Sequence, residues 1–216
     1  MSFPMTFPPP DLLLPFLVAG IALNLTPGPD MTFVALSGAR GGRTAGLAAA
    51  AGIFTGCCGH ILFAMVGLSA LIAASQTAFA VVKWIGVAYL LYLAIKLVRQ
   101  KDGASRMPVD DATYGPWHAF RQAALVNLLN PKVGIFFLAF LPQFVEPDTQ
   151  SPWREILALG ILFNTTGALV NAIVGLTSAA AAGRLTASRW FGRATRWFAA
   201  TVMGGIAVKL ALSRNN

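Results

Sequence analysis

Two short segments of this chain place a charged residue directly after a proline, with apolar sequence on both sides. The first reads Asn24-Leu-Thr-Pro-Gly-Pro-Asp30, and the second reads Asn127-Leu-Leu-Asn-Pro-Lys132. Proline lacks an amide donor and clashes with the preceding helical turn, so each segment is predicted to interrupt a helix. Amides freed at the start of a half-helix suit a carboxylate, whereas freed carbonyls together with Asp30 suit an ammonium. The two breaks could therefore bind a zwitterion such as an amino acid.

The predicted substrate site consists of the polar, proline and glycine residues of these two segments. They are Asn24, Thr26, Pro27, Gly28, Pro29, Asp30, Asn127, Asn130, Pro131 and Lys132. The asparagines can supply neutral hydrogen bonds to a substrate. Three structural interpretations stay open: the prolines only kink their helices, Asp30 and Lys132 form a structural pair, or Asp30 only caps the second half-helix.

Polar residues on two further apolar segments could support such a site. Histidine is a side chain that can take up and release protons under physiological conditions, so His60 could carry a proton, although a neutral histidine bonded to another helix is an equally good interpretation. A stripe of small and polar residues recurs at helical spacing, and we expect it to face inward as packing or as cavity lining. Its members are Gly160, Asn164, Gly167, Asn171 and Gly175.

The segment around His60 also contains two glycines and two adjacent cysteines. Gly52 and Gly56 form a small-xxx-small pair, which permits close approach of another helix. Cys57 and Cys58 are expected to be reduced packing residues. A soft-metal site formed by the two thiols and His60 is the minor alternative.

The composition indicates which solvent surrounds these segments. Of the 216 residues, 56% are hydrophobic and only 11% are charged, whereas a soluble domain carries about 25% charged residues. So few charges leave too little polar surface to cover a water-exposed globule, and the chain is therefore predicted to lie in a membrane. The net charge of +8 fits basic cytoplasmic loops better than nucleic-acid binding.

Six apolar segments approach or exceed the length of about 20 residues that a helix needs to cross a bilayer. They comprise residues 12–36, 45–74, 78–98, 119–145, 156–182 and 198–212. The last is short and contains Lys209, so five spans is the alternative. The predicted fold class is an all-α polytopic membrane protein, with residues 1–216 forming a single transporter domain. Its half-repeats cover about 11–98 and 117–212, and a cytoplasmic loop at 99–116 joins them.

An odd number of spans in each half means that the two halves insert with opposite orientation, each beginning with a proline-broken span. Matched broken spans in inverted halves are the best sequence indication of a transport site near the membrane midplane. Basic residues are concentrated in three alternate loops and their flanks. They are Arg40, Arg43, Lys96, Arg99, Lys101, Arg106, Arg121, Arg184, Arg189, Arg193 and Arg196. This bias places those loops in the cytoplasm and both termini outside.

Searches for catalytic and nucleotide-binding motifs find none in this sequence. It has no Walker loop, nucleophile elbow or metalloprotease helix. Its two histidines, His60 and His118, are too few and too far apart for a catalytic metal site. We therefore expect no enzyme activity, no cofactor and no bound metal, and an ion gradient is the simplest driving force. The glycine-rich faces allow a homodimer.

The order and spacing of these motifs resemble the LysE/RhtB family of lysine and homoserine–threonine exporters along nearly the whole chain. The resemblance rests on the two proline motifs, Arg40-Gly-Gly-Arg-Thr-Ala-Gly46, Lys83-Trp-Ile-Gly-Val-Ala-Tyr-Leu90, Phe136-Phe137 and Leu141-Pro-Gln-Phe144. It implies export of amino acids or close derivatives from the bacterial cytoplasm, across the inner membrane and against protons. It also implies that the two proline motifs form the central pathway.

One feature departs from the pattern of that family. Many relatives carry an acidic residue in the fifth span, where this chain has Asn164, Gly167 and Asn171. A basic amino acid is therefore a less favoured substrate. Two alternatives stay open: an exporter of another small solute, such as a metal ion or a dipeptide, and a membrane enzyme or scaffold that transports nothing.

Overall fold

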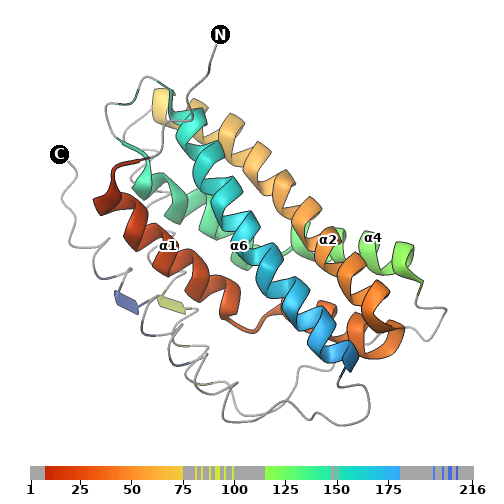
Figure 1. The fold of residues 1–216 in the computed structure, drawn as a ribbon. Coiled ribbons are helices and arrows are strands. Elements are labelled where there is room, and N and C mark those ends of the chain that lie inside the picture. The colour runs from red at the N-terminus through yellow and green to blue at the C-terminus, as the bar shows by residue number, and fades with distance from the viewer. Residues whose placement is uncertain are drawn as a thin grey trace.

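A computed structural model describes residues 8–74, 115–146 and 151–180, together with Thr149 and isolated positions within 81–99 and 197–208. Every element assigned in this part of the chain is helical (Figure 1). The predicted loop at 99–116, the third span and the sixth span lie wholly or mostly outside the described residues. The six-span count, the inverted halves and the domain bounds therefore stay predictions.

The described part of the chain contains helices and short helical turns. They are α1 (Pro10–Leu25), α2 (Pro29–Ala74), α4 (Pro116–Leu128), α5 (Pro131–Ile135), the π-helical turn η1 (Phe136–Phe140), the 3-10 turn η2 (Leu141–Phe144) and α6 (Pro152–Ala180). The long helix α2 packs against both α6 and α4, and α1 lies along α6 (Figure 1). Several of these helices begin with proline, whose fixed φ and missing amide suit the first helical position.

Both predicted proline breaks are present. α1 ends at Leu25 and α2 begins at Pro29, while α4 ends at Leu128 and α5 begins at Pro131. The second break bends the combined segment Pro116–Leu128 and Pro131–Phe144 by 46°. After α5 this segment continues as a π-helical turn and then as a 3-10 turn that contains Pro142.

The described residues contain two helical segments, Pro29–Gly67 and Pro152–Ala180, that are long and apolar enough to cross a membrane. The bent segment of α4, α5 and the following turns makes a third if it counts as one span. These apolar helices support the prediction of a membrane protein. α6 overlaps most of residues 156–182, which were predicted to form the fifth span.

The chain reverses direction without the irregular loop that was expected around Arg40 and Arg43. Gly42, with φ 73°, is the non-helical residue inside α2, and only glycine adopts this left-handed region easily. A Cβ added to Gly46 would lie 2.8 Å from the Gly175 carbonyl oxygen, and Gly38 contacts the same residue. Residues eight apart in a straight helix are separated by about 12 Å, so the helix must fold back at Gly42.

Gly52 and Gly56 provide the close helix contact that their spacing predicted. A Cβ at Gly56 would lie 2.6 Å from the Ala124 carbonyl oxygen, and Gly52 lies against the backbone of Phe120. The α2 and α4 backbones therefore touch where the second broken span begins. This contact fixes the depth of Asn127 relative to α2.

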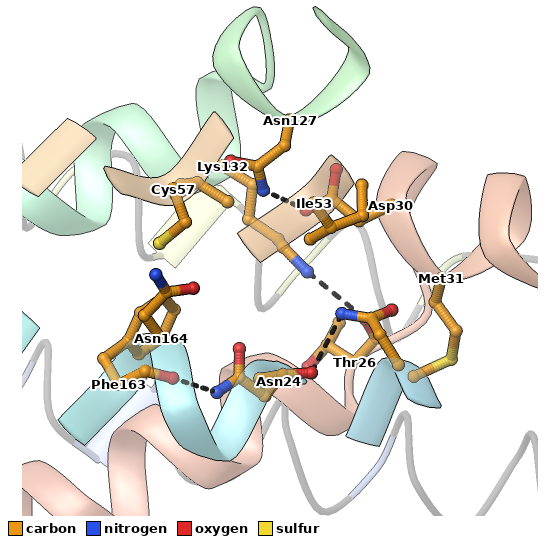
Figure 2. A pocket seen from close by; sticks show the side chains of 13 residues that line it. Asn24, Thr26, Asp30, Met31, Ile53, Cys57, Asn127, Lys132, Phe163 and Asn164 are labelled. Carbon is orange, nitrogen blue, oxygen red and sulfur yellow. Dashed lines mark hydrogen bonds between the residues drawn. The ribbon is translucent and has the colours of Figure 1, made fainter. Parts of the chain in front are cut away.

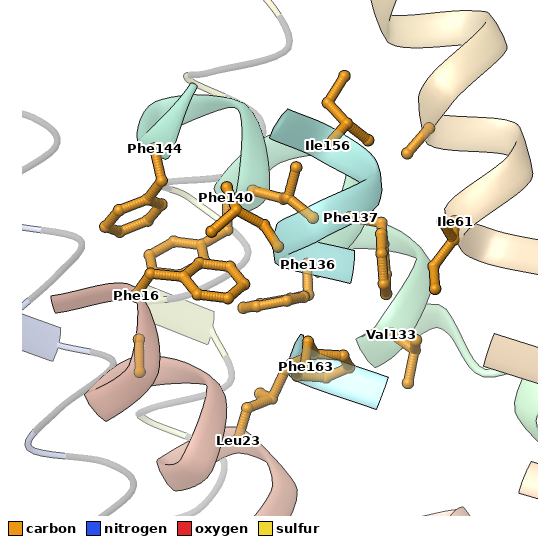
Figure 3. Close-up of a cluster of buried hydrophobic side chains, with 14 of the residues drawn as sticks. Phe16, Leu23, Ile61, Val133, Phe136, Phe137, Phe140, Phe144, Ile156 and Phe163 are labelled. Carbon is orange, nitrogen blue, oxygen red and sulfur yellow. The ribbon is translucent and has the colours of Figure 1, made fainter. Parts of the chain in front are cut away.

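A cluster of aromatic side chains packs between α1, α6 and the two turns that follow α5 (Figure 3). Its rings come from α1, η1, η2 and α6, and they are Phe16, Phe136, Phe137, Phe140, Phe144 and Phe163. The Phe136 and Phe163 rings stack with centroids 4.4 Å apart, and all six side chains are buried. Burial of large rings dominates core energetics, so this cluster holds the broken span 4 against α1 and α6.

Candidate functional site

A cavity of about 30 Å³ lies where the two broken spans meet α2 and α6 (Figure 2). Its lining comprises Asn24, Thr26, Asp30, Met31, Ile53, Cys57, Asn127, Lys132, Val133, Phe163, Asn164, Gly167 and Asn171. This volume holds about two water molecules, whereas even the smallest amino acid is several times larger than water. The cavity in the described conformation is therefore too small to hold an amino acid.

Asp30 connects the first broken span to the second. Its side chain is 8% exposed, and its Oδ2 accepts a hydrogen bond of 2.9 Å from Asn127 Nδ2. Its other oxygen, Oδ1, is buried without a hydrogen-bond partner among the described residues. The carboxylate bonds to the opposite broken span instead of capping α2, and it keeps one acceptor oxygen free.

Lys132 places its ammonium at the carboxyl end of α1. Its Nζ donates to the carbonyl oxygens of Leu23, at 3.3 Å, and Thr26, at 3.2 Å. Figure 2 shows the Lys132 side chain extending from the second break toward the first. The freed carbonyls were expected to suit a substrate ammonium, and in this conformation the protein's own ammonium occupies them.

The residues between the cavity-lining positions shape the two breaks. Gly28 gives Lys132 room, since a Cβ there would lie 3.2 Å from Nζ. Asn130 caps α5, because its Oδ1 accepts a 3.0 Å hydrogen bond from the Lys132 amide. Pro27, Pro29, Gly28, Asn130 and Pro131 do not line the cavity themselves.

The polar stripe of α6 faces inward, as its spacing predicted, and all its members are buried. Asn164 and Asn171 both line the cavity. Asn164 Nδ2 donates to the Phe54 carbonyl at 3.1 Å, and Asn171 Nδ2 donates to the Gly167 carbonyl at 3.0 Å. Asn24 ties α1 to the same helix through the Phe163 carbonyl at 3.2 Å. These asparagines form the polar wall opposite Asp30.

His60 lies behind the cavity and does not line it. Its Nε2 is 3.0 Å from the Asn127 carbonyl oxygen, and its ring stacks with Phe137 at a centroid distance of 6.0 Å. A carbonyl can only accept, so Nε2 carries the proton in this contact. His60 therefore reaches Asp30 only through Asn127.

The sequence did not predict the apolar wall of the cavity. This wall consists of Met31, Ile53, Cys57, Val133 and Phe163. Met31 and Val133 directly follow the two charged residues, and Ile53 and Cys57 are one helical turn apart on α2. Their place next to the charged residues, or one helical turn apart, could have indicated this wall. Apolar residues in an apolar span, however, cannot be told apart from ordinary packing residues. Among the described residues, no three His, Cys, Asp or Glu side chains gather as a metal site would require.

Comparison with protein families identifies the class of protein to which this chain belongs. The family model described as LysE type translocator matches residues 21–214, which includes both broken spans. The chain belongs to the LysE-type translocator family. This confirms the resemblance inferred from the motifs, and it fits the prediction of a multi-pass membrane protein that acts as a translocator and not as an enzyme.

Similar LysE-type sequences occur in several bacteria. A membrane protein of Pseudomonas aeruginosa, described as uncharacterized, is 32% identical over 206 residues, covering 91% of this chain and 93% of its own. The leucine efflux protein of Klebsiella pneumoniae is 33% identical, covering 68% and 70%. The homoserine/homoserine lactone efflux protein of Salmonella typhimurium is 34% identical, with the same coverage. No solved structure matches this LysE-type chain.

Proposed function

We propose that this translocator exports amino acids or close derivatives from the cytoplasm, exchanging them for protons. The observation that carries the proposal is the cavity at the two helix breaks, which holds one carboxylate, Asp30, and one ammonium, Lys132. Relatives named for efflux of leucine and of homoserine or its lactone support the same substrate class.

The charges of the cavity match those of a zwitterion. An opposite pair of buried charges accepts a neutral amino acid without adding net charge to the low-dielectric interior. Asp30 would bind the substrate ammonium through its free Oδ1, and Lys132 would bind the carboxylate. Asn24, Asn164 and Asn171 would supply neutral hydrogen bonds, while the apolar wall would contact the side chain.

Transport requires the cavity to enlarge and to open alternately to each side. The proposed movement separates the α1 break from the α4–α5 break, since these two breaks bring Asp30 and Lys132 to the cavity. Paired broken helices at a central site are typical of transporters in which one half of the protein rocks against the other. We propose that the protein has the predicted six spans in two inverted halves, with both termini outside, and that these two halves move against each other.

Protons are the proposed coupling ion. Asp30 is the carboxylate of the cavity, and His60, bonded to the Asn127 carbonyl, is the second proposed proton carrier. A proton entering from outside would neutralise Asp30 and weaken its attraction for the substrate ammonium. Release of the substrate and uptake of the proton would then occur at the same group.

The test is efflux from cells preloaded with a panel of labelled amino acids, with and without an uncoupler. Asp30→Asn is compared with Asp11→Asn, which makes the same change at an exposed position at the start of α1. We expect at least one amino acid to leave faster with the wild-type protein, and this gain to vanish with the uncoupler and with Asp30→Asn only. Unchanged efflux across the whole panel would overturn the proposal.

A further inference from the structure

The carbonyls at the end of α1 form a site for a protonated amine. α1 ends because Pro27 provides no amide for the Leu23 carbonyl, and Thr26 then has extended backbone, with φ −70° and ψ 119°. The carbonyls of Leu23 and Thr26 are therefore directed at the break. Leu23 O also accepts the Thr26 amide at 3.1 Å, and among the described residues Lys132 is the donor to Thr26 O. Asp30 lies nearby with a free carboxylate oxygen.

We propose that Lys132 is a tethered stand-in for the substrate ammonium. In the described conformation its Nζ occupies the amine site formed by the Leu23 and Thr26 carbonyls beside Asp30, and the ammonium of an arriving substrate displaces it. The identity of the displacing amine rests on the proposed function. The existence of an amine site that Lys132 fills does not.

The geometry allows Lys132 to leave this site. Both of its hydrogen bonds are long, at 3.2 and 3.3 Å, and they go to main-chain carbonyls and not to the carboxylate of Asp30. A lysine side chain is a flexible stem with a compact charge, and Gly28 places only hydrogen against its tip. Once displaced, the same ammonium is free to pair with the substrate carboxylate.

This arrangement gives the empty carrier a way to return. An unoccupied site with freed main-chain carbonyls would lack hydrogen-bond donors, which disfavours closure also when Asp30 is protonated. Lys132 supplies those donors from within the chain, so the protein closes without a second solute. The exporter then needs only a substrate on the cytoplasmic side and a proton from outside.

The test uses the purified full-length protein and small amines, and it requires no knowledge of the substrate. Lys132→Ala empties the amine site, and Arg121→Ala removes an exposed basic residue on α4 as the control. Propylammonium chloride should raise the melting temperature of Lys132→Ala by roughly 3–6 °C at ten times its Kd. Tetramethylammonium chloride, which has no N–H donor, should not do so. Wild type and Arg121→Ala should respond to neither salt.

A second variant covers the case in which Lys132→Ala does not fold. The methionine side chain ends one atom short of Nζ, so Lys132→Met leaves a gap of the size of an ammonium ion. Ammonium chloride should then stabilise Lys132→Met relative to tetramethylammonium chloride. Equal responses to the donor and non-donor salts in the variant that folds would overturn the proposal, whether or not any amino acid is exported.

Discussion

Asn127 Nδ2 donates to Asp30 Oδ2 over 2.9 Å, and this hydrogen bond joins two proline-broken helical segments that lie 97 residues apart in the sequence. The main-chain carbonyl of Asn127 also accepts a hydrogen bond of 3.0 Å from His60 Nε2. One asparagine therefore connects the buried carboxylate, the second break and α2. It is the residue whose removal should separate these parts.

Asn127→Ala should reduce export about tenfold or more, because a buried carboxylate left without its donor costs roughly 1–3 kcal/mol. The measurement is the initial rate of efflux, normalised to the amount of protein in the membrane. Thr55→Ala, which changes an exposed hydroxyl on α2, is the control and should export normally. Equal rates for the two variants would show that the Asn127–Asp30 bond is dispensable.

Gly56→Ala should destabilise the protein by roughly 1–3 kcal/mol or more, the typical cost of overpacking. The added Cβ would lie 2.6 Å from the Ala124 carbonyl, which cannot rotate away. Gly67→Ala on the same helix meets no atom within 4 Å and should be neutral or slightly stabilising. Chemical unfolding in bicelles compares the two, and similar midpoints would contradict the close α2–α4 contact.

Phe163→Ala should both destabilise the fold and broaden the range of exported substrates. This ring lines the cavity and stacks with Phe136, and truncating a buried phenylalanine typically costs about 3–5 kcal/mol. Phe63→Ala is the matched control, since Phe63 is 68% exposed. The check is unfolding together with efflux of larger amino acids, and a Phe163→Ala protein with wild-type stability and selectivity would contradict this role.

His60→Gln should distinguish a proton carrier from a hydrogen-bond donor. Glutamine retains an N–H that can reach the Asn127 carbonyl, but it does not titrate. If His60 carries protons, as proposed, the variant loses uncoupler-sensitive efflux at unchanged thermal stability. Full proton-coupled efflux from His60→Gln would assign His60 a structural role only.

Asn164→Asp should shift the substrate preference toward basic amino acids. Asn164 lines the cavity opposite Asp30, and a second carboxylate there would favour an extra positive charge on the substrate. The measurement is competition between labelled leucine and lysine for export. Asn164→Gln adds no charge and should leave the preference unchanged, so an identical ratio in both variants would exclude position 164 as the determinant of charge selectivity.

The positions of the helix breaks could be read from the sequence because their cause is local. Proline removes a backbone donor wherever it stands in a helix, and the two prolines around Gly28 end α1 where Pro15, alone within α1, does not. α5 likewise begins at Pro131. The inward orientation of Asn164 and Asn171 follows from helical periodicity in the same way. Local geometry did not reveal the turn at Gly42, because a single glycine replaced the loop that two arginines had suggested.

The sequence by itself determined the membrane setting, the two broken spans and the charged residues beside them, since composition, proline and helical spacing act over a few turns. Only the tertiary structure decided which atoms those charges meet. Asp30 bonds to Asn127, and Lys132 bonds to the end of α1. Such partners come from helices far apart in sequence, and their contact depends on how closely glycine faces let the helices approach.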